Sequence, residues 1–480
     1  MLVVCATQAA QLDDGDRDDA ARNTLEVTMR RRNFLTSTAI IGGVGLAAAC
    51  APGSESGGGD APAPKADEIV TDPAELGDVT LVMWDQEVRG AQNDAIESLI
   101  ASFQEKYPNI TIERVSQSND DLQQQTGLAL SGNDVPDVLQ VNNARGDMGT
   151  FVADGLLTDL TGYAEAYGWE DRFTESVLAK TRYSKDGVTF GEGELYGLPQ
   201  TGEICGIFYS QKKLDELGVE APTSWDELFT LVDTALEKDE QPIVLGNLDK
   251  WPAFHVFGPL QANFVDAETI VTLGMGNAGA DWTSDDNVAA LTQLADWAKD
   301  KAFGDSPNGL GYDDAWPTFT EGTGVLLIGG SWLGPDMEAV MKEDLRFMAP
   351  PAGKDGTAAT TGGTGIPFSI PAAAKNADAA AAFIDYITSD EAMDLIAEAG
   401  GMPVNRTAEL APDSGVNKDI YEAFDAVSHD GTLLPYLDYA TPSFADTGGA
   451  VLQEVIGGQT EPADAAQKLQ DDYGEFTEGS

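Results

Sequence analysis

The stretch VTLVMWDQEVRGAQNDAIESLIASFQEKYPNITIERV, residues 79–115, decides the fold class. Its first six residues, VTLVMW, are typical of a buried strand. Residues 91–108 place apolar side chains at helical spacing and end at Pro108, which predicts a helix. Residues 110–115, ITIERV, predict a second strand. A strand, a helix and a strand in this order are the building unit of an α/β fold.

The same alternation continues along the chain. DVLQV, residues 137–141, predicts a third strand, and the pattern resumes beyond residue 203. Strands alternating with amphipathic helices indicate mostly parallel sheets covered by helices on both faces, here in two α/β units without an internal repeat. The further elements expected are strands at 204–210, 242–246 and 325–330, helices at 224–238 and 286–300, and a helical stretch at 376–401 with a break at Ser389 and Asp390.

The N-terminal region is predicted to carry an export signal. RRRNFLTSTAIIGGVGLAAAC, residues 30–50, places three arginines before an apolar run that contains three glycines. The run from residue 34 to 49 is shorter than the roughly 20 apolar residues of a membrane-spanning helix. We therefore predict a signal peptide at residues 29–49, and its Arg31-Arg32 pair resembles the twin-arginine form.

The end of this signal resembles that of a lipoprotein. In LAAAC, residues 46–50, Cys50 would receive lipid and anchor the mature chain to the membrane, although cleavage after the alanines without lipid is an alternative. Residues 50–77 are rich in Gly, Pro and Ala, which predicts a flexible tether. Residues 1–28 lie upstream of Met29, where a signal would normally begin, so we interpret them as a wrongly assigned start.

The composition is strongly acidic. The chain has 81 acidic and 27 basic residues, for a net charge of −54, and residues 1–49 hold only six of the acids and five of the bases. The acidity therefore belongs to the mature protein. Such a surface repels phosphate backbones, so no nucleic-acid partner is expected. We interpret the acidic surface as one that keeps the protein soluble. Binding of a cationic ligand is the alternative interpretation. The roughly 400 residues after the tether suffice for two domains.

Cysteine and histidine are too sparse for a metal or disulfide framework. Cys205 is the only cysteine of the folded part and lies in the apolar stretch ICGIFY, where we expect a small buried side chain. The two histidines, His255 and His429, form no zinc-type spacing with it. We therefore expect no metal and no cofactor.

One glycine motif resembles a dinucleotide site. Gly274, Gly276 and Gly279 fit G-x-G-x-x-G and follow TIVTL, residues 269–273, which looks like a strand. The sequence ADWTSDD follows where a phosphate-facing helix should begin. We interpret the motif as a glycine-rich loop.

Five segments in order carry a family resemblance. They are LIASFQEKYPNITIERV (99–115), DVPDVLQVNNARGDMGTFVADGLLTDL (134–160), LYGLPQTGEICGIFYSQKKLDELGVEAPTSWDEL (195–228), FTEGTGVLLIGGSW (319–332) and AAAAFIDYITSDEAMDLIAEAGGMPVN (379–405). Together they resemble the extracellular solute-binding proteins of ABC importers, in the group of the maltose- and oligosaccharide-binding proteins. The resemblance covers residues 78–475.

This resemblance implies the two-lobed periplasmic-binding-protein fold (type II, Venus-flytrap), with a hinge and an interlobe cleft. It places one lobe at 78–201 plus 366–405 and the other at 202–365 plus 406–475. In this family a ligand that touches both lobes stabilises the closed state. The implied function is that of a monomeric, non-enzymatic receptor, which captures a mono- or oligosaccharide and delivers it to the membrane permease of an ABC importer.

Sugars are bound by aromatic rings together with planar hydrogen-bonding side chains. At the end of the first strand, Trp84 is expected to stack on ligand beside Asp85 and Gln86, with a core position as the alternative for Trp84. Asn142 and Asn143 end the Pro-Asp strand, where the family often places polar contacts; capping of the next helix is their alternative.

The second lobe is expected to contribute further aromatic rings. Trp332 matches a Gly-x-Trp position from which the family stacks an aromatic ring on sugar. Trp251 and His255 lie four residues apart and would share a helix face towards the cleft, although a core histidine is an equal alternative. Trp225 is expected to pack the start of its helix.

Polar groups are expected at the hinge and near the C-terminus. Glu203 matches a carboxylate that the maltose-binding relatives direct at ligand, with a hinge salt bridge as the alternative. Gly362 and Gly363 resemble a hinge segment where backbone amides approach ligand. Ala445 replaces an expected aromatic residue, and three residues are candidates to substitute for it: Tyr436, Asp438 and Tyr439.

Other ligand and function classes give different expectations. A cationic ligand such as a polyamine is an alternative because Asp85 and Glu203 lie beside aromatic residues. A secreted glycosidase would need two carboxylates flanking a bond, which 81 acids supply by chance. Binding of ferric iron would need a cluster of tyrosines in the cleft, and binding of an anion would need arginines there. Neither is evident in the sequence.

Overall fold

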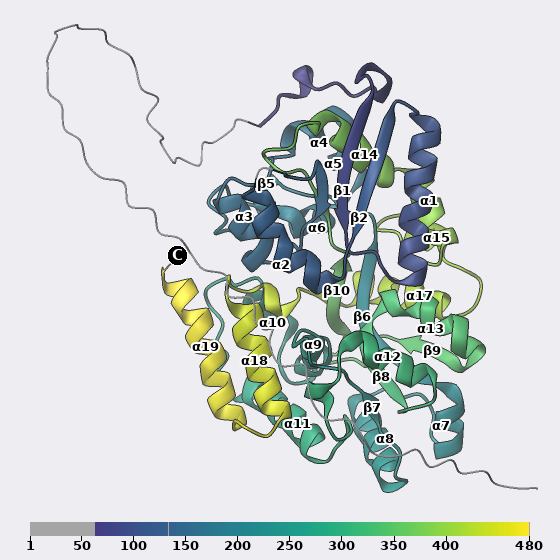
Figure 1. The fold of residues 1–480 in the computed structure, drawn as a ribbon. Coiled ribbons are helices and arrows are strands. Elements are labelled where there is room, and N and C mark those ends of the chain that lie inside the picture. The colour runs from purple at the N-terminus through teal and green to yellow at the C-terminus, as the bar shows by residue number, and fades with distance from the viewer. Residues whose placement is uncertain (1–62, 133, 480) are drawn as a thin grey trace, which may run out of the picture. The chain divides into compact units, whose positions relative to one another are not determined.

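A computed structural model describes residues 63–132 and 134–479 of the chain. The predicted start at 1–28, the signal peptide at 29–49 and Cys50 lie outside these residues. The described residues belong to one compact unit, whose elements are shown in Figure 1. No helix in this described part is long and apolar enough to cross a membrane.

The first sheet has the strand order β11-β3-β1-β2. β1 is parallel to β2, with Val79 opposite Ile110, and parallel to β3, whereas β11 runs antiparallel at the edge. The mostly parallel arrangement predicted from residues 79–115 is thus confirmed here. The strands are β1 (Val79–Asp85), β2 (Ile110–Ser116), β3 (Val138–Gln140) and β11 (Phe368–Ser369).

Helices cover this sheet and complete a hydrophobic core, which with the sheet we call the first lobe. Phe103 of α1 contacts Phe383 edge-on at 5.2 Å between ring centroids and Tyr386 at 5.4 Å, so segments almost 300 residues apart pack together. The elements around the sheet are α1 (Gly90–Lys106), α2 (Asn119–Leu130), α3 (Thr150–Ala153), α4 (Thr161–Tyr167), α5 (Trp169–Arg172), α6 (Glu175–Leu178), the small β4 (Arg182–Tyr183) and β5 (Glu194–Leu195) pair, α14 (Ala377–Ile387) and α15 (Asp390–Glu398).

The end of the predicted tether packs on the first lobe. The backbone N–H of Val70 donates to Asp378 at 3.1 Å, and Asn109 Nδ2 donates to the carbonyl of Pro73 at 2.9 Å. Ile69 and Leu76 pack against the core. The prediction of a flexible segment up to residue 77 is therefore wrong for its last part, because apolar and backbone groups there find partners on the lobe.

The second sheet is mixed, with the order β12-β10-β6-β8-β7 and β9 also paired to β6. β6 is antiparallel to β8, β9 and β10. The expectation of a mostly parallel sheet is wrong here, because β6 enters directly from the first lobe and runs opposite to its neighbours. The strands are β6 (Gly202–Ser210), β7 (Ile243–Val244), β8 (Leu326–Gly330), β9 (Leu345–Met348), β10 (Ala359–Thr364) and β12 (Thr432–Leu434).

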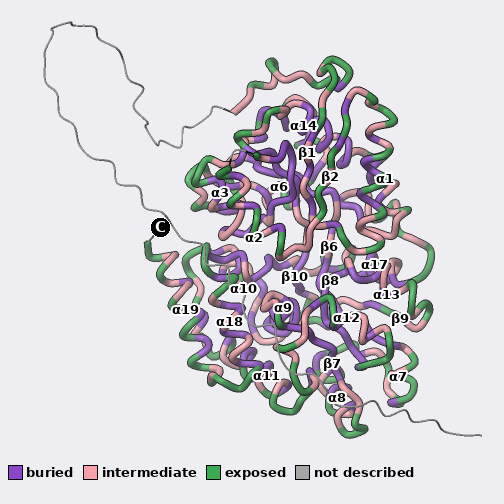
Figure 2. The backbone as a smooth tube through the Cα atoms, in the orientation of Figure 1, coloured by how far each residue is buried: buried purple, intermediate pink, exposed green. Residues whose placement is uncertain are grey.

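The helices of the second lobe enclose two further apolar clusters. Figure 2 shows that many residues of this part are buried. Trp225 is 6% exposed and donates to the carbonyl of Pro351 at 3.1 Å, which confirms its packing role. The helices are α7 (Gln211–Leu217), α8 (Trp225–Glu237), α9 (Pro252–Phe264), α10 (Ala267–Gly274), α11 (Asp285–Lys299), α12 (Tyr312–Thr320), α13 (Gly334–Met341), α16 (Thr407–Leu410), α17 (Val416–Asp430), α18 (Phe444–Ile456) and α19 (Pro462–Gly479).

The strand-like segment 269–273 is part of α10. The carboxylate of Asp266 accepts from the backbone N–H of Thr269 at 2.9 Å and caps the helix start. The buried side chains of Ile270 and Leu273 lie on its inner face. The strand interpretation was wrong, and no strand leads into the glycines that follow.

Three chain segments connect the lobes, and backbone hydrogen bonds join them. The N–H of Gly202 donates to Met402 at 2.9 Å, and that of Gly365 donates to Thr201 at 2.9 Å. The N–H of Val404 donates to Gln200 at 3.3 Å. This bonded group of crossings is the hinge region of the two-lobed fold.

Candidate functional site

Five ring side chains of the second lobe form a continuous contact, which we call the aromatic wall. Ring centroids lie 4.4 Å apart between Trp251 and Tyr312 and 5.1 Å apart between Trp251 and His255. His255 lies 5.4 Å from Trp332 and 5.6 Å from Tyr436. The structure thus brings together four rings predicted from the sequence and adds Tyr312.

Local sequence explains how two of these rings are placed. Trp332 follows Gly330, where an added Cβ would lie 2.0 Å from the indole, so glycine provides the space in which the ring lies. The Trp332 Nε1–H donates to Tyr312 Oη at 2.8 Å. Tyr312 begins α12, and its backbone N–H donates to Asp249 at 2.8 Å, which holds that helix start beside Trp251.

His255 is part of a buried ring contact and carries no charge. It is 5% exposed, and its Nδ1 has no hydrogen-bond partner among the described residues. Burial lowers the pKa of His255 to about 3, because a charged imidazolium would lose its hydration. The neutral ring therefore serves as a packing surface of the wall.

Glu203 joins the hinge strand to the wall. Tyr436 Oη donates to Glu203 Oε1 at 2.6 Å. Burial raises the pKa of Glu203 to about 8, the bond from Tyr436 opposes this, and the nearby Glu87 adds to the rise. Glu203 has no ion pair in the described part of the chain, so the alternative of a hinge salt bridge is wrong.

A second buried carboxylate, Glu87, follows the first strand. Its Oε1 accepts from Gln140 Nε2 at 2.7 Å and from Gln200 Nε2 at 3.4 Å. Burial raises its pKa, partly offset by the bond from Gln140, while Asp85 raises it further and Arg89 and Arg114 lower it. Three side chains of the first lobe and hinge thus form one buried polar group.

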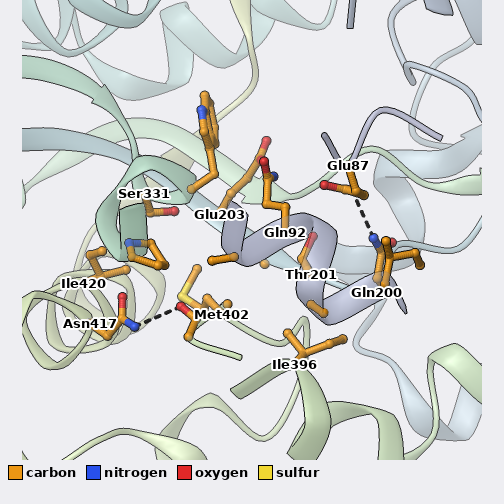
Figure 3. A pocket seen from close by; sticks show the side chains of 18 of the residues that line it. Glu87, Gln92, Gln200, Thr201, Glu203, Ser331, Ile396, Met402, Asn417 and Ile420 are labelled. Carbon is orange, nitrogen blue, oxygen red and sulfur yellow. Dashed lines mark hydrogen bonds between the residues drawn. The ribbon is translucent and has the colours of Figure 1, made fainter. Parts of the chain in front are cut away.

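A cavity lies between the lobes and is lined by both carboxylates (Figure 3). Its empty volume is about 680 Å³, which includes space open to solvent. The first lobe contributes α1 to the lining, and the hinge segments contribute the residues around Gln200 and Met402. The second lobe contributes α13, α17 and Trp332. The lining residues are Glu87, Ala91, Gln92, Ala95, Ile96, Leu99, Gln200, Thr201, Gly202, Glu203, Ser331, Trp332, Pro335, Ile396, Gly400, Gly401, Met402, Asn417, Ile420 and Tyr421.

The predicted group at the end of β1 divides into different roles. Trp84 is partly buried and packs against an apolar cluster that also contacts Trp332. Asp85 is fully buried, and both its oxygens accept from Arg114 at 2.8 Å. Gln86 accepts from Asn119 at 3.1 Å. Asp85 of β1 therefore binds Arg114 of the neighbouring strand β2. Ligand contact by Trp84, Asp85 and Gln86 stays a prediction.

Asn142 and Asn143 shape the loop after β3. Asn142 Oδ1 accepts from the N–H of Ala144 at 3.2 Å, but the helical turn Arg145–Gly149 that follows has no side-chain cap at Ala144, so the structure does not show the capping alternative. Asn143 is 2% exposed, and its Nδ2 donates to the carbonyl of Lys180 at 2.7 Å. Neither residue lines the cavity. Their contact with ligand stays a prediction.

Gly362 and Gly363 lie in β10 against the hinge strand. Gly363 pairs with Glu203, and Gly362 pairs with Ile204. A Cβ on Gly362 would lie 2.7 Å from the carbonyl of Glu203, and Gly363 has a φ of 134°, which favours glycine. The two glycines allow β10 to approach the strand that carries Glu203.

Two acidic residues meet between the lobes away from this cavity. Burial raises the pKa of Asp147, on the first lobe, to about 7, and repulsion from Asp438 adds to it. Burial also raises the pKa of Asp438, on the second lobe, to about 7. Asp438 Oδ1 has no hydrogen-bond partner among the described residues. The next residue, Tyr439, has its ring centroid 5.2 Å from that of Tyr436.

Two arginines of the first lobe reach the second lobe. Arg89 pairs with Asp313 at 2.9 Å and lies over the Tyr312 ring at 5.5 Å. Arg145 Nη2 donates to the carbonyl of Met275 at 2.7 Å, and its guanidinium lies 4.9 Å from the Phe476 ring centroid. Met275 lies in the glycine motif of residues 274–279, which thus receives an arginine of the opposite lobe.

Tyr312, Glu87 and Gln200 were missed from the sequence. Glu87 was within reach, since it follows the predicted Trp84, Asp85 and Gln86 at the carboxyl end of the strand. Tyr312 and Gln200 carry no local signal, because their positions depend on contacts with residues far along the chain. No group of three or more metal-binding side chains occurs in the described residues.

Comparison with known proteins agrees with this architecture. The profile of the family described as "Bacterial extracellular solute-binding protein" matches residues 89–394. The chain belongs to this family. It is 25% identical over 319 residues to the multiple sugar-binding protein of Streptococcus mutans, covering 64% of this chain and 71% of that protein. The predicted family resemblance is confirmed.

Solved structures of the family share the two-lobed fold. A chitin oligosaccharide binding protein superposes with a TM-score of 0.70 at 21% identity, covering 83% of this chain and 99% of that one. The GacH receptor of Streptomyces glaucescens, solved unliganded and with acarbose, gives 0.69 at 22% identity and covers 83% and 98%. The predicted type II fold is confirmed.

Proposed function

We propose that this chain is the substrate-binding component of an ABC sugar importer. It captures a mono- or oligosaccharide between its lobes and delivers it to a membrane permease. The observation that carries this proposal is the aromatic wall, whose Trp332 lines the interlobe cavity together with Glu203 of the hinge strand. A sugar offers apolar C–H faces to a ring and hydroxyls to a carboxylate.

The position of the cavity allows a bound ligand to contact both lobes and stabilise their closed arrangement. A ligand bound to Glu203 and Trp332 touches the hinge strand and the second lobe, while Glu87 and Gln92 reach it from the first lobe. Such a ligand stabilises the closed form by its difference in affinity for the two forms. The permease then recognises the closed receptor. The names of the relatives, a multiple sugar-binding protein and a chitin oligosaccharide binding protein, support the ligand class.

The remaining parts of the proposal concern location. The family is extracellular, and we propose that Cys50 anchors this member by lipid to the outer face of the cytoplasmic membrane. The chain acts as a monomer, and no catalytic step is assigned to it. We also propose that the two lobes have the boundaries predicted from the sequence, 78–201 plus 366–405 for the first and 202–365 plus 406–475 for the second.

A sugar panel tests the function. A ligand that binds only the folded protein raises its melting temperature. We expect at least one mono- or oligosaccharide to raise Tm by several degrees and to bind in calorimetry. Trp332→Ala should weaken that binding by roughly 10- to 100-fold, since ring contacts contribute about 1–3 kcal/mol.

Phe229→Ala is the matched control, because Phe229 lies on the same lobe, packs against Trp225 and Trp297, and does not line the cavity. Its affinity for the sugar should equal that of the wild-type protein. The proposal fails if no sugar stabilises the protein, or if Trp332→Ala binds as well as the control.

Two other functions have distinct outcomes. A cationic solute such as a polyamine is favoured by the two carboxylates of the cavity, and it would bind in the same panel while sugars would not. A glycosidase would release products from oligosaccharides during long incubation. We expect the sugar to be recovered unchanged.

A further inference from the structure

The cavity has an excess of hydrogen-bond acceptors. Gln200 is 3% exposed, and its Oε1 has no hydrogen-bond partner among the described residues. The buried Oε1 of Gln92 has none there either. The amide of Gln200 is oriented by its Nε2, which donates to Glu87 Oε1 at 3.4 Å. Two amide oxygens and two carboxylates therefore line one cavity (Figure 3). A buried acceptor without a donor costs free energy, so a ligand that donates to it gains affinity.

The donors of the lining are mostly bound within the protein. Trp332 Nε1 donates to Tyr312 at 2.8 Å, and Asn417 Nδ2 donates to the carbonyl of Gly400 at 2.9 Å. Tyr421 Oη donates to the carbonyl of Gly401 at 2.9 Å. The hydroxyls of Thr201 and Ser331 and the amide nitrogen of Gln92 remain. Since a hydroxyl acts as donor or acceptor, the lining has few obligatory donors to offer a ligand.

The charges of the lining point the same way. Glu87 and Glu203 line the cavity, and no lysine, arginine or histidine does. Arg89 and Arg114 lie near Glu87 and lower its pKa, and Arg114 donates to its backbone carbonyl at 2.7 Å, but neither lines the cavity: Arg89 is paired with Asp313 at 2.9 Å and Arg114 with Asp85 at 2.8 Å. In the described part of the chain, the carboxyl of Glu203 accepts a side-chain hydrogen bond from the hydroxyl of Tyr436 alone. The cavity accordingly lacks a cation of its own.

We propose that the sugar bound here carries a protonated amino group, which lies between Glu87 and Glu203 and faces the Trp332 ring. This inference rests on the proposed function and narrows its ligand class to amino sugars. An ammonium group supplies three donors and no acceptor, whereas a hydroxyl in its place supplies one donor and brings lone pairs. The face of an indole also attracts a cation.

Protonation gives the proposal a second signature. Burial raises the pKa of Glu203 to about 8, and it raises that of Glu87 as well. An ammonium group beside these carboxyls favours their ionised form. Binding of an amino sugar near pH 7 should therefore release protons to the buffer, and binding of a neutral sugar should not.

Calorimetry on the full chain with matched sugar pairs tests the ligand class. The pairs are glucosamine and glucose, galactosamine and galactose, mannosamine and mannose, and the β-1,4-linked glucosamine dimer and cellobiose. In at least one pair we expect the amine to bind at least tenfold more tightly. Titrations in phosphate and in Tris, whose ionisation enthalpies differ, should show proton release for that amine alone.

Glu203→Gln separates the charge from the shape of the site. It should weaken binding of the amine at least tenfold more than binding of its neutral partner, and it should reduce the buffer dependence, with Glu87 as the remaining source of protons. Glu321→Gln, an exposed carboxyl outside the cavity, is the charge-matched control and should bind both sugars like the wild-type protein.

The possible failures are distinguishable. If neutral sugars bind as well as their amines in every pair, if only neutral sugars of the wider panel bind, or if Glu203→Gln weakens both equally, the amino-sugar inference is overturned and the sugar receptor stands. If spermidine binds while no sugar of the pairs or of the wider panel does, both the inference and the proposed function are overturned. If no probe binds, both are overturned as well.

Discussion

Tyr436 donates a hydrogen bond of 2.6 Å to Glu203, and this contact connects the aromatic wall to the hinge strand. Both side chains are buried, and Glu203 lines the interlobe cavity. The phenol is the only side-chain donor to that carboxyl in the described residues. The pair therefore determines how the carboxylate is held before a ligand arrives.

Tyr436→Phe should destabilise the protein. It removes a hydrogen bond to a carboxyl group, which contributes about 1.5–3 kcal/mol to the free energy of unfolding. Since the bond lowers the pKa of Glu203, its loss should raise that pKa further. Urea unfolding at pH 9, where Glu203 is ionised, measures the effect. Tyr421→Phe, which loses a bond to the neutral carbonyl of Gly401, should cost about 0.5–1.5 kcal/mol. Equal losses in the two variants would contradict a charged role for Glu203.

The unfolding free energy should fall as pH rises from 5 to 8. Burial raises the pKa of Glu203 from 4.5 to about 8 and those of Asp147 and Asp438 from 3.8 to about 7. The folded protein then binds more protons than the unfolded chain across this window, so stability is highest on the acid side. Below pH 6.5 the lowered pKa of His255 acts in the opposite direction, since the unfolded chain takes up that proton first.

Denaturant unfolding at intervals of half a pH unit measures this profile. Glu203→Gln should flatten the decrease between pH 5 and 8, because its amide does not titrate. A wild-type stability that rises steadily from pH 5 to 8 would show that these carboxyls are ionised at ordinary pKa values.

Asp85→Ala should affect stability. Asp85 is fully buried, and Arg114, which it binds through both oxygens, loses its buried partner in the variant. Breaking such a pair costs about 3–5 kcal/mol. Urea unfolding should show this loss, and calorimetry below the unfolding transition should still detect the sugar. A variant of normal stability without sugar binding would instead support the predicted ligand contact of Asp85.

Arg145→Ala should weaken ligand binding without removing a ligand contact. Arg145 is 2% exposed and donates across the lobes to the carbonyl of Met275 at 2.7 Å. Because the contact joins the two lobes, its loss should favour the open form and reduce affinity by roughly tenfold, or about 1.4 kcal/mol. Calorimetry measures this loss, and stopped-flow fluorescence should show faster release of the sugar.

Arg172→Ala is the control for this variant. Arg172 donates to Asp385 at 2.8 Å and to Thr388 at 3.1 Å, and all three residues lie in the first lobe. Its loss should lower stability and leave the affinity of the folded protein unchanged. Identical affinities in the Arg145 variant, the control and the wild-type protein would show that the cross-lobe contact does not govern closure.

Local periodicity of apolar residues was enough to predict most helices and strands, but the prediction was wrong at particular segments. The helix at 91–108 and the strands around it follow from spacing that depends on near neighbours alone. TIVTL in α10 was read as a strand, because a run of five apolar and β-branched residues fits either element. The capping carboxylate of Asp266 decides for the helix. The direction of β6 was not predictable either, since it depends on the lobe from which the strand enters.

The candidate site divides in the same way. Trp251 and His255 were predicted on a shared face from their four-residue spacing, and their rings lie 5.1 Å apart. Asp85 had the right residue type in the right place, but Arg114 on the neighbouring strand takes both its oxygens. No pattern near Tyr312 indicates that it completes the wall.

The sequence by itself determined the α/β class, the family, the order of the main elements and several of the rings, because these depend on spacing and motifs within short segments. Only the tertiary structure decided which acidic side chains face the cavity and which are held by arginine. It also decided that the glycine motif at 274–279 receives Arg145. These outcomes depend on contacts between residues that are distant in the chain, and burial then sets the charge state of each group.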